Sequence, residues 1–407
     1  MIGRQSGAGA PGAGAPAAPV IGLAVGRGTG PELAAVFEQV LGALTTDHPT
    51  GVRIARADRL YHSYVSLRAE RDPARVQRLT AQDADHYEDF CRTLAAGGAT
   101  ALFRTAINAQ SLYLVRQRLR AVKVDLLRAG GTSLLLVRDQ AQGFYTGENQ
   151  HAAGRLTRSL TFSRDITEAV IEYAVRRARR EWPDGRIDRV VMAYKFHLLD
   201  GAFDRWVADI ADRLGLRIEV FQPDTVNRNL ITHGLPERTL LIAGNEWADI
   251  MHVVLLDRFG SERQENRCTE NVLLGLGDAG LGDAGPGDSD LRDSDLRDAG
   301  LRDTSSGGAG LVEYQTVHGS ADDLAGRDLV NPLATIRAAA VIAERHVGVP
   351  GAVGAVEAAL AELEDLGVRT ADLGGEHSTG AVADALVALL TTARATVPAH
   401  AAAEHRS

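Results

Sequence analysis

Residues 20–32, Val20-Ile21-Gly22-Leu23-Ala24-Val25-Gly26-Arg27-Gly28-Thr29-Gly30-Pro31-Glu32, carry the pattern that decides the fold. A strand-like apolar run passes into a glycine-rich turn, and residues with apolar side chains at helical spacing follow it. Proline is favoured at the start of a helix, where its missing N–H would have no partner anyway. Strand, glycine turn and helix in this order begin an α/β unit, with backbone N–H groups free at the helix N-terminus. Most turns of this kind merely connect two elements.

The rest of the chain continues the alternation of strands and helices, which predicts an α/β fold. Apolar runs at residues 133–137, 190–193 and 238–243 predict buried strands, and amphipathic helical patterns lie between them. Arg138, Lys195 and Asp249 follow these runs. Ligands of open α/β sheets bind at the carboxyl ends of the strands. We therefore expect these polar side chains near a ligand site.

The use of lysine is unusual. Of the 44 Lys and Arg residues only two, Lys123 and Lys195, are lysines. Arginine stays protonated, whereas a partly buried lysine can shift its pKa and transfer a proton. Lys195 at the end of a predicted strand is therefore a candidate catalytic residue. The alternative is that Lys195 merely survived a general drift from lysine to arginine.

The composition is that of a globular protein of 407 residues, long enough for two domains. A net charge of −9 and a pI near 5.8 argue against a nucleic-acid or membrane-surface binder, and no run is long enough to span a membrane. The two cysteines form neither a disulfide framework nor a metal-binding spacing, which favours the cytoplasm. Residues 1–19 and 394–407 are expected to be tails, the first of them disordered.

Residues 275–304 form a degenerate array of five-residue units: GLGDA, GLGDA, GPGDS, DLRDS, DLRDA and GLRDT. Calcium-binding repeats have longer periods and a denser glycine frame. We therefore expect a disordered acidic insertion over residues 275–308.

Four motifs resemble those of the isocitrate and isopropylmalate dehydrogenase family of β-decarboxylating dehydrogenases, and they follow one another along the chain in the family's order. Residues 318–332, HGSADDLAGRDLVNP, are similar to the family's nucleotide loop HGSAPDIAG…NP, and residues 372–375 match its DLGG. Residues 137–147, VRDQAQGFYTG, resemble VRENTEGLYSG, and residues 26–32 are similar to PGDGIGPE. The resemblance implies a two-domain isopropylmalate-dehydrogenase-like α/β fold. Residues 20–108 and 259–393 would form a large nucleotide-binding domain, and residues 109–258 a smaller substrate and dimerisation domain.

The resemblance also implies an activity, namely NAD-dependent oxidation and decarboxylation of a 3-substituted malate-type 2-hydroxy acid with Mg²⁺ or Mn²⁺. By motif position, Lys195 resembles the lysine that moves the hydroxyl proton, and Tyr145 resembles the tyrosine that protonates the enol. The residues that resemble the substrate-binding arginines are Arg116, Arg128 and Arg138, with Arg118 as a rival to Arg116. The segment 107–111, which would select the substrate, is not recognisable.

The metal ligands implied by the resemblance are Asp224 and Asp249. Lys195 and Asp224 would reach the active site of the neighbouring subunit, which implies a homodimer with shared sites. The family segment that resembles residues 245–253 carries two aspartates four residues apart. Asp249 matches the first, but Val253 stands in place of the second and cannot bind a metal ion. His252 beside it is a weaker candidate to compensate. An inactive homologue acting as a partner subunit, and oxidation without decarboxylation, are the alternatives.

The nucleotide would be bound by the loop that begins at residue 318. An acid at Asp323 favours NAD over NADP, because a carboxylate accepts hydrogen bonds from a ribose diol and repels a 2′-phosphate. The residues implied in cofactor binding are His318, Gly319, Ser320, Ala321, Asp323 and Asn331.

Overall fold

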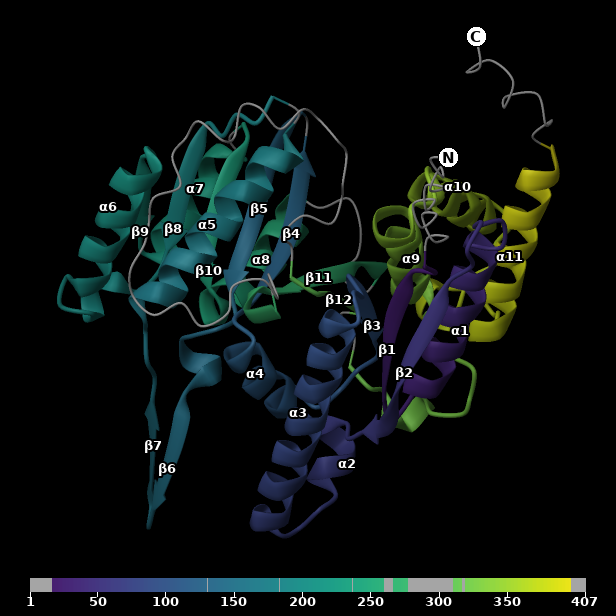
Figure 1. Cartoon of the computed structure of the whole chain (residues 1–407), viewed down its shortest axis with the longest axis horizontal. Helices are drawn as coiled ribbons and strands as arrows, with labels where there is room; N and C mark the ends of the chain where they lie inside the picture. The colour runs from purple at the N-terminus through teal and green to yellow at the C-terminus, as the bar shows by residue number, and fades with distance from the viewer. Residues whose placement is uncertain are drawn as a thin grey trace, which may run out of the picture.

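The computed structural model describes residues 17–129, 131–182, 184–235, 237–259, 266–276, 310–316 and 319–396 (Figure 1). His318, nearly all of the pentad insertion and the outer parts of both expected tails lie outside these ranges. Ten strands form one continuous mixed sheet in the order β2-β1-β3-β12-β11-β4-β5-β10-β8-β9. Their bounds are β1 Val20–Gly26, β2 Arg53–Tyr61, β3 Ala101–Arg104, β4 Ala121–Ala129, β5 Thr132–Asp139, β8 Arg189–Ala193, β9 Ile218–Phe221, β10 Thr239–Gly244, β11 Cys268–Leu273 and β12 Val312–Thr316.

The sheet has two parallel halves joined by antiparallel strands. Strands β2, β1, β3 and β12 run parallel, and so do β5, β10, β8 and β9. Strands β11 and β4 pair antiparallel with each other and with their outer neighbours β12 and β5. The segments predicted as two domains supply one contiguous half of the sheet each. The boundary between the predicted domains thus falls between β11 and β4.

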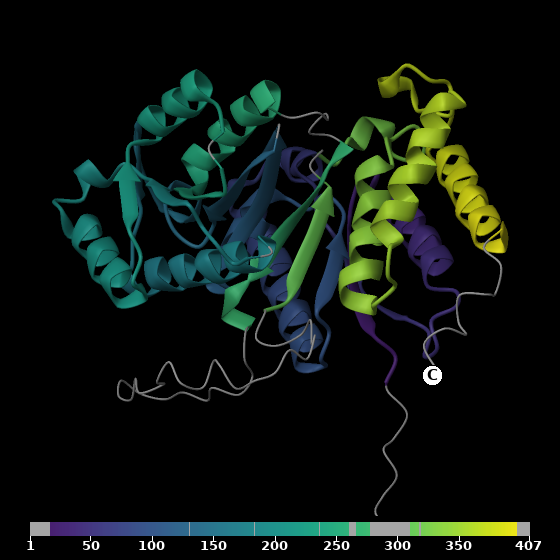
Figure 2. The ribbon, with the colours of Figure 1, turned by 90° about the horizontal axis from the view of Figure 1, so that it is seen from above.

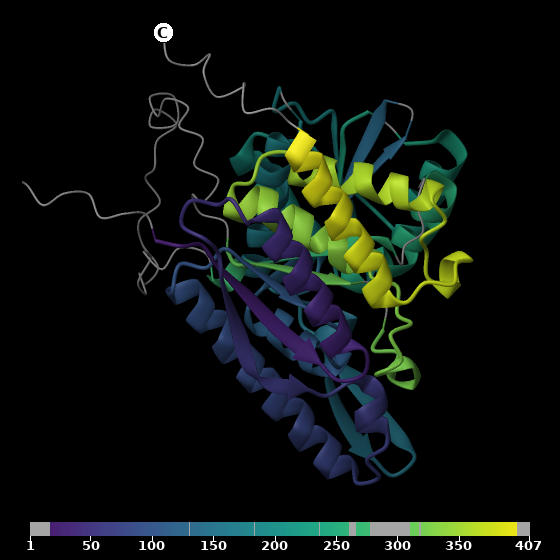
Figure 3. The ribbon, with the colours of Figure 1, turned by 90° about the vertical axis from the view of Figure 1, so that its right-hand side faces the viewer.

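Helices cover both faces of the sheet, as the view from above shows (Figure 2). One face packs against α1, α5, α6, α9, α10 and α11, and the other against α3, α4, α7 and α8. Helix α1, from the start of the chain, lies beside α11, from its end (Figure 3). The helix bounds are α1 Gly30–Leu44, α2 Tyr64–Arg68, α3 Pro73–Ala96, α4 Ala109–Arg118, α5 Arg164–Glu181, α6 Ala202–Leu214, α7 Pro223–His233, α8 Asn245–Phe259, α9 Leu333–Ile342, α10 Ala352–Asp365 and α11 Thr379–Thr396.

Buried strands explain the apolar runs of the sequence, because a strand covered on both faces needs apolar side chains at successive positions. In β5, Leu135 and Val137 join the core on the α5 side, while Leu134 and Leu136 join the core on the α8 side. The α/β expectation is confirmed. None of the described helices is both long and apolar enough to cross a membrane.

A two-stranded hairpin, β6 Glu148–Ala152 and β7 Arg155–Ser159, projects from the body of the molecule (Figure 1). The described side chains of the hairpin are mostly exposed. Arg158 on β7 donates hydrogen bonds from Nε to the carbonyl oxygen of Phe144 (2.7 Å) and from Nη2 to that of Tyr145 (3.1 Å). The hairpin is thus bonded to the turn that carries Tyr145.

Candidate active site

A cavity of about 520 Å³ opens at the ends of β3, β5 and β12 and beside α4. Four cationic side chains line it, namely Arg104, Arg116, Lys123 and Arg138, and all four are buried. One acidic residue among the described lining residues, Asp249, faces the same space. The cavity therefore suits a small molecule with several negative charges.

Arg138 and Asp249, which follow predicted strands, meet at one edge of this cavity, and Tyr145, which only the family resemblance singled out, lies beside them. Lys195, which was also expected at the strand ends, does not line the cavity. Arg138 is the last residue but one of β5, and its Nη2 donates to Oδ1 of Asp249 (2.8 Å) and to Oδ1 of Asn245 (3.2 Å). The Tyr145 hydroxyl donates to Oδ2 of Asp249 (3.4 Å), and its ring stacks on Tyr113 with centroids 4.6 Å apart. Burial, followed by the charge of Asp249, raises the pKa of Tyr145 to about 12. Its phenol is therefore protonated at neutral pH.

A second buried layer lies beneath the cavity around Glu313 on β12. Glu313 accepts from Arg104 Nε (2.9 Å), the Tyr87 hydroxyl (2.6 Å) and Asn271 Nδ2 (3.0 Å). Arg116 Nη2 lies 3.9 Å from the same carboxylate. Burial alone would raise the pKa of Glu313, but these two arginines outweigh it and hold the pKa below its ordinary value. The layer fixes two of the four cations in place.

Lys123 was not expected at the site and is the residue that sequence reasoning missed. It lies on β4, directly opposite Arg138 on β5. Burial, only partly offset by Asp125, lowers the pKa of Lys123 to about 8. The scarcity of lysine in the chain was a signal for Lys123 as much as for Lys195.

The glycine-rich turn and the loop after β12 form another wall of the cavity. The backbone N–H of Thr29 donates to the carbonyl oxygen of Ser320 (2.9 Å), and the Ser63 hydroxyl donates to Oδ1 of Asp322 (2.5 Å). Gly28 has φ +77°, and a Cβ atom there would lie 2.3 Å from the Ser320 carbonyl oxygen. A glycine is therefore required at this position. The loop and the start of α1 are held side by side.

The remaining residues implied in nucleotide binding are distributed around this loop. Gly319, Ser320 and Ala321 line the cavity, and Asp323 is exposed. Asn331 is buried, and its Nδ2 donates to Asn266 Oδ1 (3.0 Å) and Asp372 Oδ2 (2.9 Å). Asn331 therefore holds the start of α9 in place.

Lys195 and Asp224 lie together but outside the cavity lining. The Lys195 ammonium is 2.7 Å from Oδ1 of Asp224, 3.3 Å from Oε1 of Gln222 and 5.5 Å from the centre of the Trp247 ring. Asp224 is exposed, and its pair with Lys195 lowers its pKa. Within a single chain these two residues therefore do not join Tyr145 and Arg138.

Arg128 is placed where it cannot perform the expected role within its own chain. Its side chain is 70% exposed and pairs with Glu181 at 2.9 Å. Arg118 is likewise exposed and pairs with Asp85 and Glu88. Arg116 is thus the α4 arginine that faces the cavity. The expectation for Arg128 is corrected: it points outward because β4 alternates, and Lys123 is the β4 cation on the cavity side.

The described residues of one chain do not assemble a metal site. No group of three or more His, Cys, Asp or Glu side chains suitable for a metal ion occurs among them. Both carboxylate oxygens of Asp249 are engaged by Arg138 and Tyr145, and Val253 is 50% exposed. His252 is buried with its Nε2 3.6 Å from Asp125, and burial lowers its pKa to about 4. His252 therefore does not compensate for the acid replaced by Val253.

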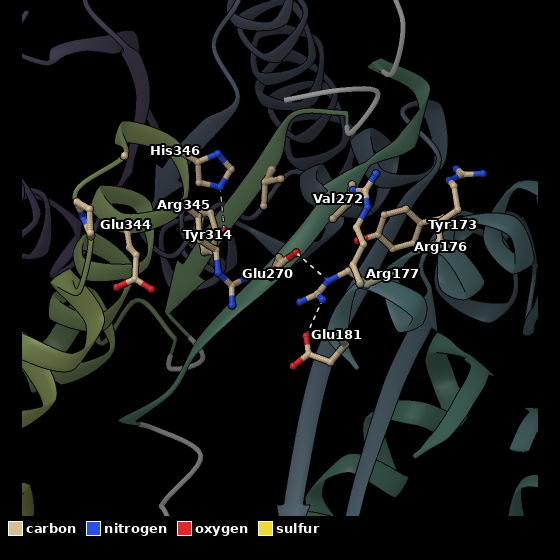
Figure 4. Close-up of a pocket in the computed structure, with 14 residues that line it drawn as sticks. Tyr173, Arg176, Arg177, Glu181, Glu270, Val272, Tyr314, Glu344, Arg345 and His346 are labelled. Carbon is tan, nitrogen blue, oxygen red and sulfur yellow. Dashed lines mark hydrogen bonds and ion pairs between the residues drawn. The ribbon is translucent and has the colours of Figure 1, made fainter. Parts of the chain in front are cut away.

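A second cavity, of about 650 Å³, lies on the opposite face of β11 and β12 (Figure 4). Side chains of successive strand residues point to opposite faces, so Tyr314 lines this cavity while Glu313 and Gln315 face the first one. Glu270 lies between Arg177 of α5 (4.0 Å) and Arg345 near the end of α9 (3.1 Å). These pairs largely neutralise the charges of the second cavity.

Comparisons with known proteins agree with these observations. The model of the isocitrate/isopropylmalate dehydrogenase family matches residues 298–386. A stretch of the chain is similar to 3-isopropylmalate dehydrogenase of Anaeromyxobacter dehalogenans (41% identity over 80 residues, 20% of this chain and 22% of that protein). The enzyme of the same name from Yarrowia lipolytica is 47% identical over 73 residues, 18% of each chain. The matched segment thus spans about a fifth of the length of these relatives.

Solved structures extend the similarity of fold to nearly the whole chain. A β-decarboxylating dehydrogenase of Thermococcus kodakarensis matches 93% of this chain and 98% of its own (TM-score 0.56, 18% identity). Isocitrate dehydrogenase of Methylococcus capsulatus matches 91% and 99% (TM-score 0.60, 19% identity). At these identities the structures show the fold alone. Part of the chain is thus similar in sequence to the isocitrate/isopropylmalate dehydrogenase family, and nearly all of it shares the fold of β-decarboxylating and isocitrate dehydrogenases of known structure.

Proposed function

We propose that the protein oxidises a malate-type 2-hydroxy acid with at least two carboxylates, using NAD, and that the oxidised acid then loses CO₂. The observation that carries this proposal is the cavity lined by four buried cations, with Tyr145 and Asp249 at its edge and the glycine-rich turn as a wall. Arginine binds carboxylates through two parallel hydrogen bonds. A substrate with a single carboxylate would leave part of this positive charge unpaired.

The residues divide the chemistry as follows. Arg116 and Arg138 hold the carboxylates of the substrate, and Lys195 of a second copy takes the hydroxyl proton, while NAD bound beside the glycine-rich turn would accept the hydride from C2. Loss of CO₂ then leaves an enol, whose carbon takes a proton from the Tyr145 phenol. The raised pKa of Tyr145 suits a proton donor, since it keeps the group protonated at neutral pH.

NAD rather than NADP is part of the proposal because of Asp323. This carboxylate is exposed on the loop that contacts the glycine-rich turn. It would accept hydrogen bonds from a ribose diol and repel a 2′-phosphate.

A homodimer is required by this chemistry, since Lys195 and Asp224 do not line the cavity of their own chain. The projecting β6–β7 hairpin supports a second copy, because an isolated two-stranded hairpin is marginally stable in water. A bound Mg²⁺ or Mn²⁺ would polarise the developing ketone. Its ligands would be Asp249 and Asp224 of a second copy, as one chain alone does not fit the ion.

The test is NADH formation with isopropylmalate, isocitrate, homoisocitrate, tartrate and malate, each with Mn²⁺ and with EDTA, while released CO₂ is trapped. NADP in place of NAD tests the role of Asp323. We expect turnover of at least one diacid with NAD and release of CO₂.

The second candidate function is an inactive partner subunit, and the exposed Val253 favours it. Binding of NAD without turnover of any acid would support this candidate. NADH formation without CO₂ would instead show simple oxidation.

A further inference from the structure

Lys123 is a buried cation placed against another cation. It is 6% exposed, and its register partner across the β4–β5 pair is Arg138, which is 4% exposed. Both side chains face the first cavity. Like charges directly opposite each other in an antiparallel pair are destabilising. The pairing of Lys123 with Arg138 therefore costs stability unless a negative charge lies close to both.

The described acidic groups near Lys123 form no ion pair with it within 4 Å, although the charge of Asp125 partly offsets the effect of burial. Asp249 pairs with Arg138, and Asp125 lies 3.6 Å from His252 and 4.0 Å from Arg138. Among the described residues, no hydrogen bond or ion pair within 4 Å reaches the Lys123 ammonium. Arg104, in contrast, has Glu313 as its partner. Among the described residues, Lys123 is thus the lining cation that has no ion-pair partner within 4 Å.

Other polar atoms around the cavity also lack partners. The Nε atoms of Arg116 and Arg138, Oε1 of Gln140 and the hydroxyl of Thr316 are buried and form no hydrogen bond within the described protein. Buried polar groups are normally hydrogen-bonded, and one without a partner costs about 1–3 kcal/mol. Because these atoms are covered by protein, they mark the polar surroundings of the cavity rather than points of direct contact with a ligand.

We propose that Lys123 and Arg138 bind one carboxylate of a diacid between β4 and β5, so that Lys123 determines the affinity of the cavity for diacids. Lys123 thereby supplies the third substrate-binding cation that the family resemblance assigned to Arg128. At pH 7 the amine is mostly protonated, and a bound carboxylate would stabilise this form further. This inference rests on the proposed function for the identity of the natural diacid.

The experiment uses succinate, a diacid without a hydroxyl group, so that binding is measured without oxidation. We expect Lys123→Met to weaken succinate binding in calorimetry by about 10- to 100-fold, because hydrogen bonds to charged groups contribute this much. Lys123→Arg, which keeps the charge, should bind within a few-fold of the wild type. Arg128→Met removes a charge from the same strand outside the cavity and should leave the affinity unchanged.

Thermal unfolding separates binding from a structural role. Without succinate, Lys123→Met should melt no lower than the wild type, because a buried charge that faces another cation and has no ion-pair partner within 4 Å in the described part of the chain has been removed. Succinate should raise the melting temperature of the wild type and of Lys123→Arg, but not that of Lys123→Met.

Three results would overturn the inference: succinate affinity of Lys123→Met within twofold of the wild type, an equal loss in Arg128→Met, or an equal loss in Lys123→Arg. Succinate binding through Lys123 without oxidation of any hydroxy acid would refute the proposed function alone. Turnover of a hydroxy acid with an unchanged KM in Lys123→Met would refute the Lys123 inference alone.

Discussion

Glu313→Gln tests whether the buried layer beneath the cavity holds the arginines in place. The substitution keeps the size of the side chain and removes its charge. Glu313 accepts from Arg104, Tyr87 and Asn271, and all of its surroundings are buried. In the variant, an amide NH₂ would face at least one of these donors. The guanidinium groups of Arg104 and Arg116 would then lack a nearby negative charge.

The expected cost follows from this geometry. Breaking a buried ion pair by removing one partner costs about 3–5 kcal/mol, because the other charge stays buried. Glutamine retains one oxygen acceptor, so we expect a loss of about 3 kcal/mol in the free energy of unfolding. Glu357→Gln is the matched control, since Glu357 forms a two-bond pair with Arg337 but is 46% exposed. An exposed pair contributes about 0–1 kcal/mol.

The dependence on pH gives a second readout. The arginines hold the folded-state pKa of Glu313 below its ordinary value of 4.5. A carboxylate with a lowered pKa contributes stability above its unfolded pKa and loses it as the pH falls through the folded value. The difference between wild type and Glu313→Gln should therefore be full at pH 7 and shrink below pH 4.5.

The assay is urea unfolding followed by circular dichroism at several pH values. A loss below about 1 kcal/mol at pH 7, equal to that of the exposed control, would refute the reasoning. So would a difference that does not change with pH.

Three further predictions concern the proposed chemistry. Lys195→Arg keeps the pair with Asp224 but cannot release a proton, so NADH formation should stop while NAD affinity in fluorescence titration stays the same; an active variant would contradict the proton-transfer role. Gly28→Ala places a Cβ atom against the Ser320 carbonyl at a positive φ, and a strain of about 1–3 kcal/mol should weaken NAD binding about tenfold or more. Unchanged NAD affinity would place the nucleotide elsewhere. Tyr145→Phe should lower kcat by about 10²- to 10⁴-fold with little change in KM, and a mainly raised KM would indicate a binding role instead.

The sequence predicted the α/β class and most central strands. Those strands are covered on both faces and therefore consist of successive apolar residues, which are easy to recognise in the sequence. It did not predict β2, an edge strand from Arg53 to Tyr61 whose exposed positions alternate with partly buried ones. It also missed β4, because Lys123 and Asp125 interrupt the apolar pattern. Lys123 lines the cavity, and Asp125 is buried beside His252; no periodicity in the sequence signals either burial.

Only those parts of the candidate site that lie at the ends of predicted strands could be located from the pattern of the sequence. Arg138, Lys195 and Asp249 were expected together at the strand ends; Arg138 and Asp249 do lie together, whereas Lys195 lies outside the cavity lining. Tyr145, singled out only by the family resemblance, lies beside Asp249. Arg128 was expected in the cavity, but the direction of its side chain depends on the register of β4, which the sequence does not reveal. Lys123 and Arg128 lie five residues apart on one strand and therefore point to opposite faces.

The ion pairs of Glu270 have a mechanical consequence. Arg177 belongs to the half of the molecule built on β5 and β10, and Arg345 to the half built on β3 and β12, so Glu270 ties the two halves together on the reverse of the sheet. Because the boundary between the halves lies between β11 and β4, a bending there that narrowed the front cavity around a ligand would lengthen these ion pairs. The ion pairs of Glu270 would thus oppose closure of the front cavity. Added salt, which screens ion pairs, would alter how tightly that cavity closes.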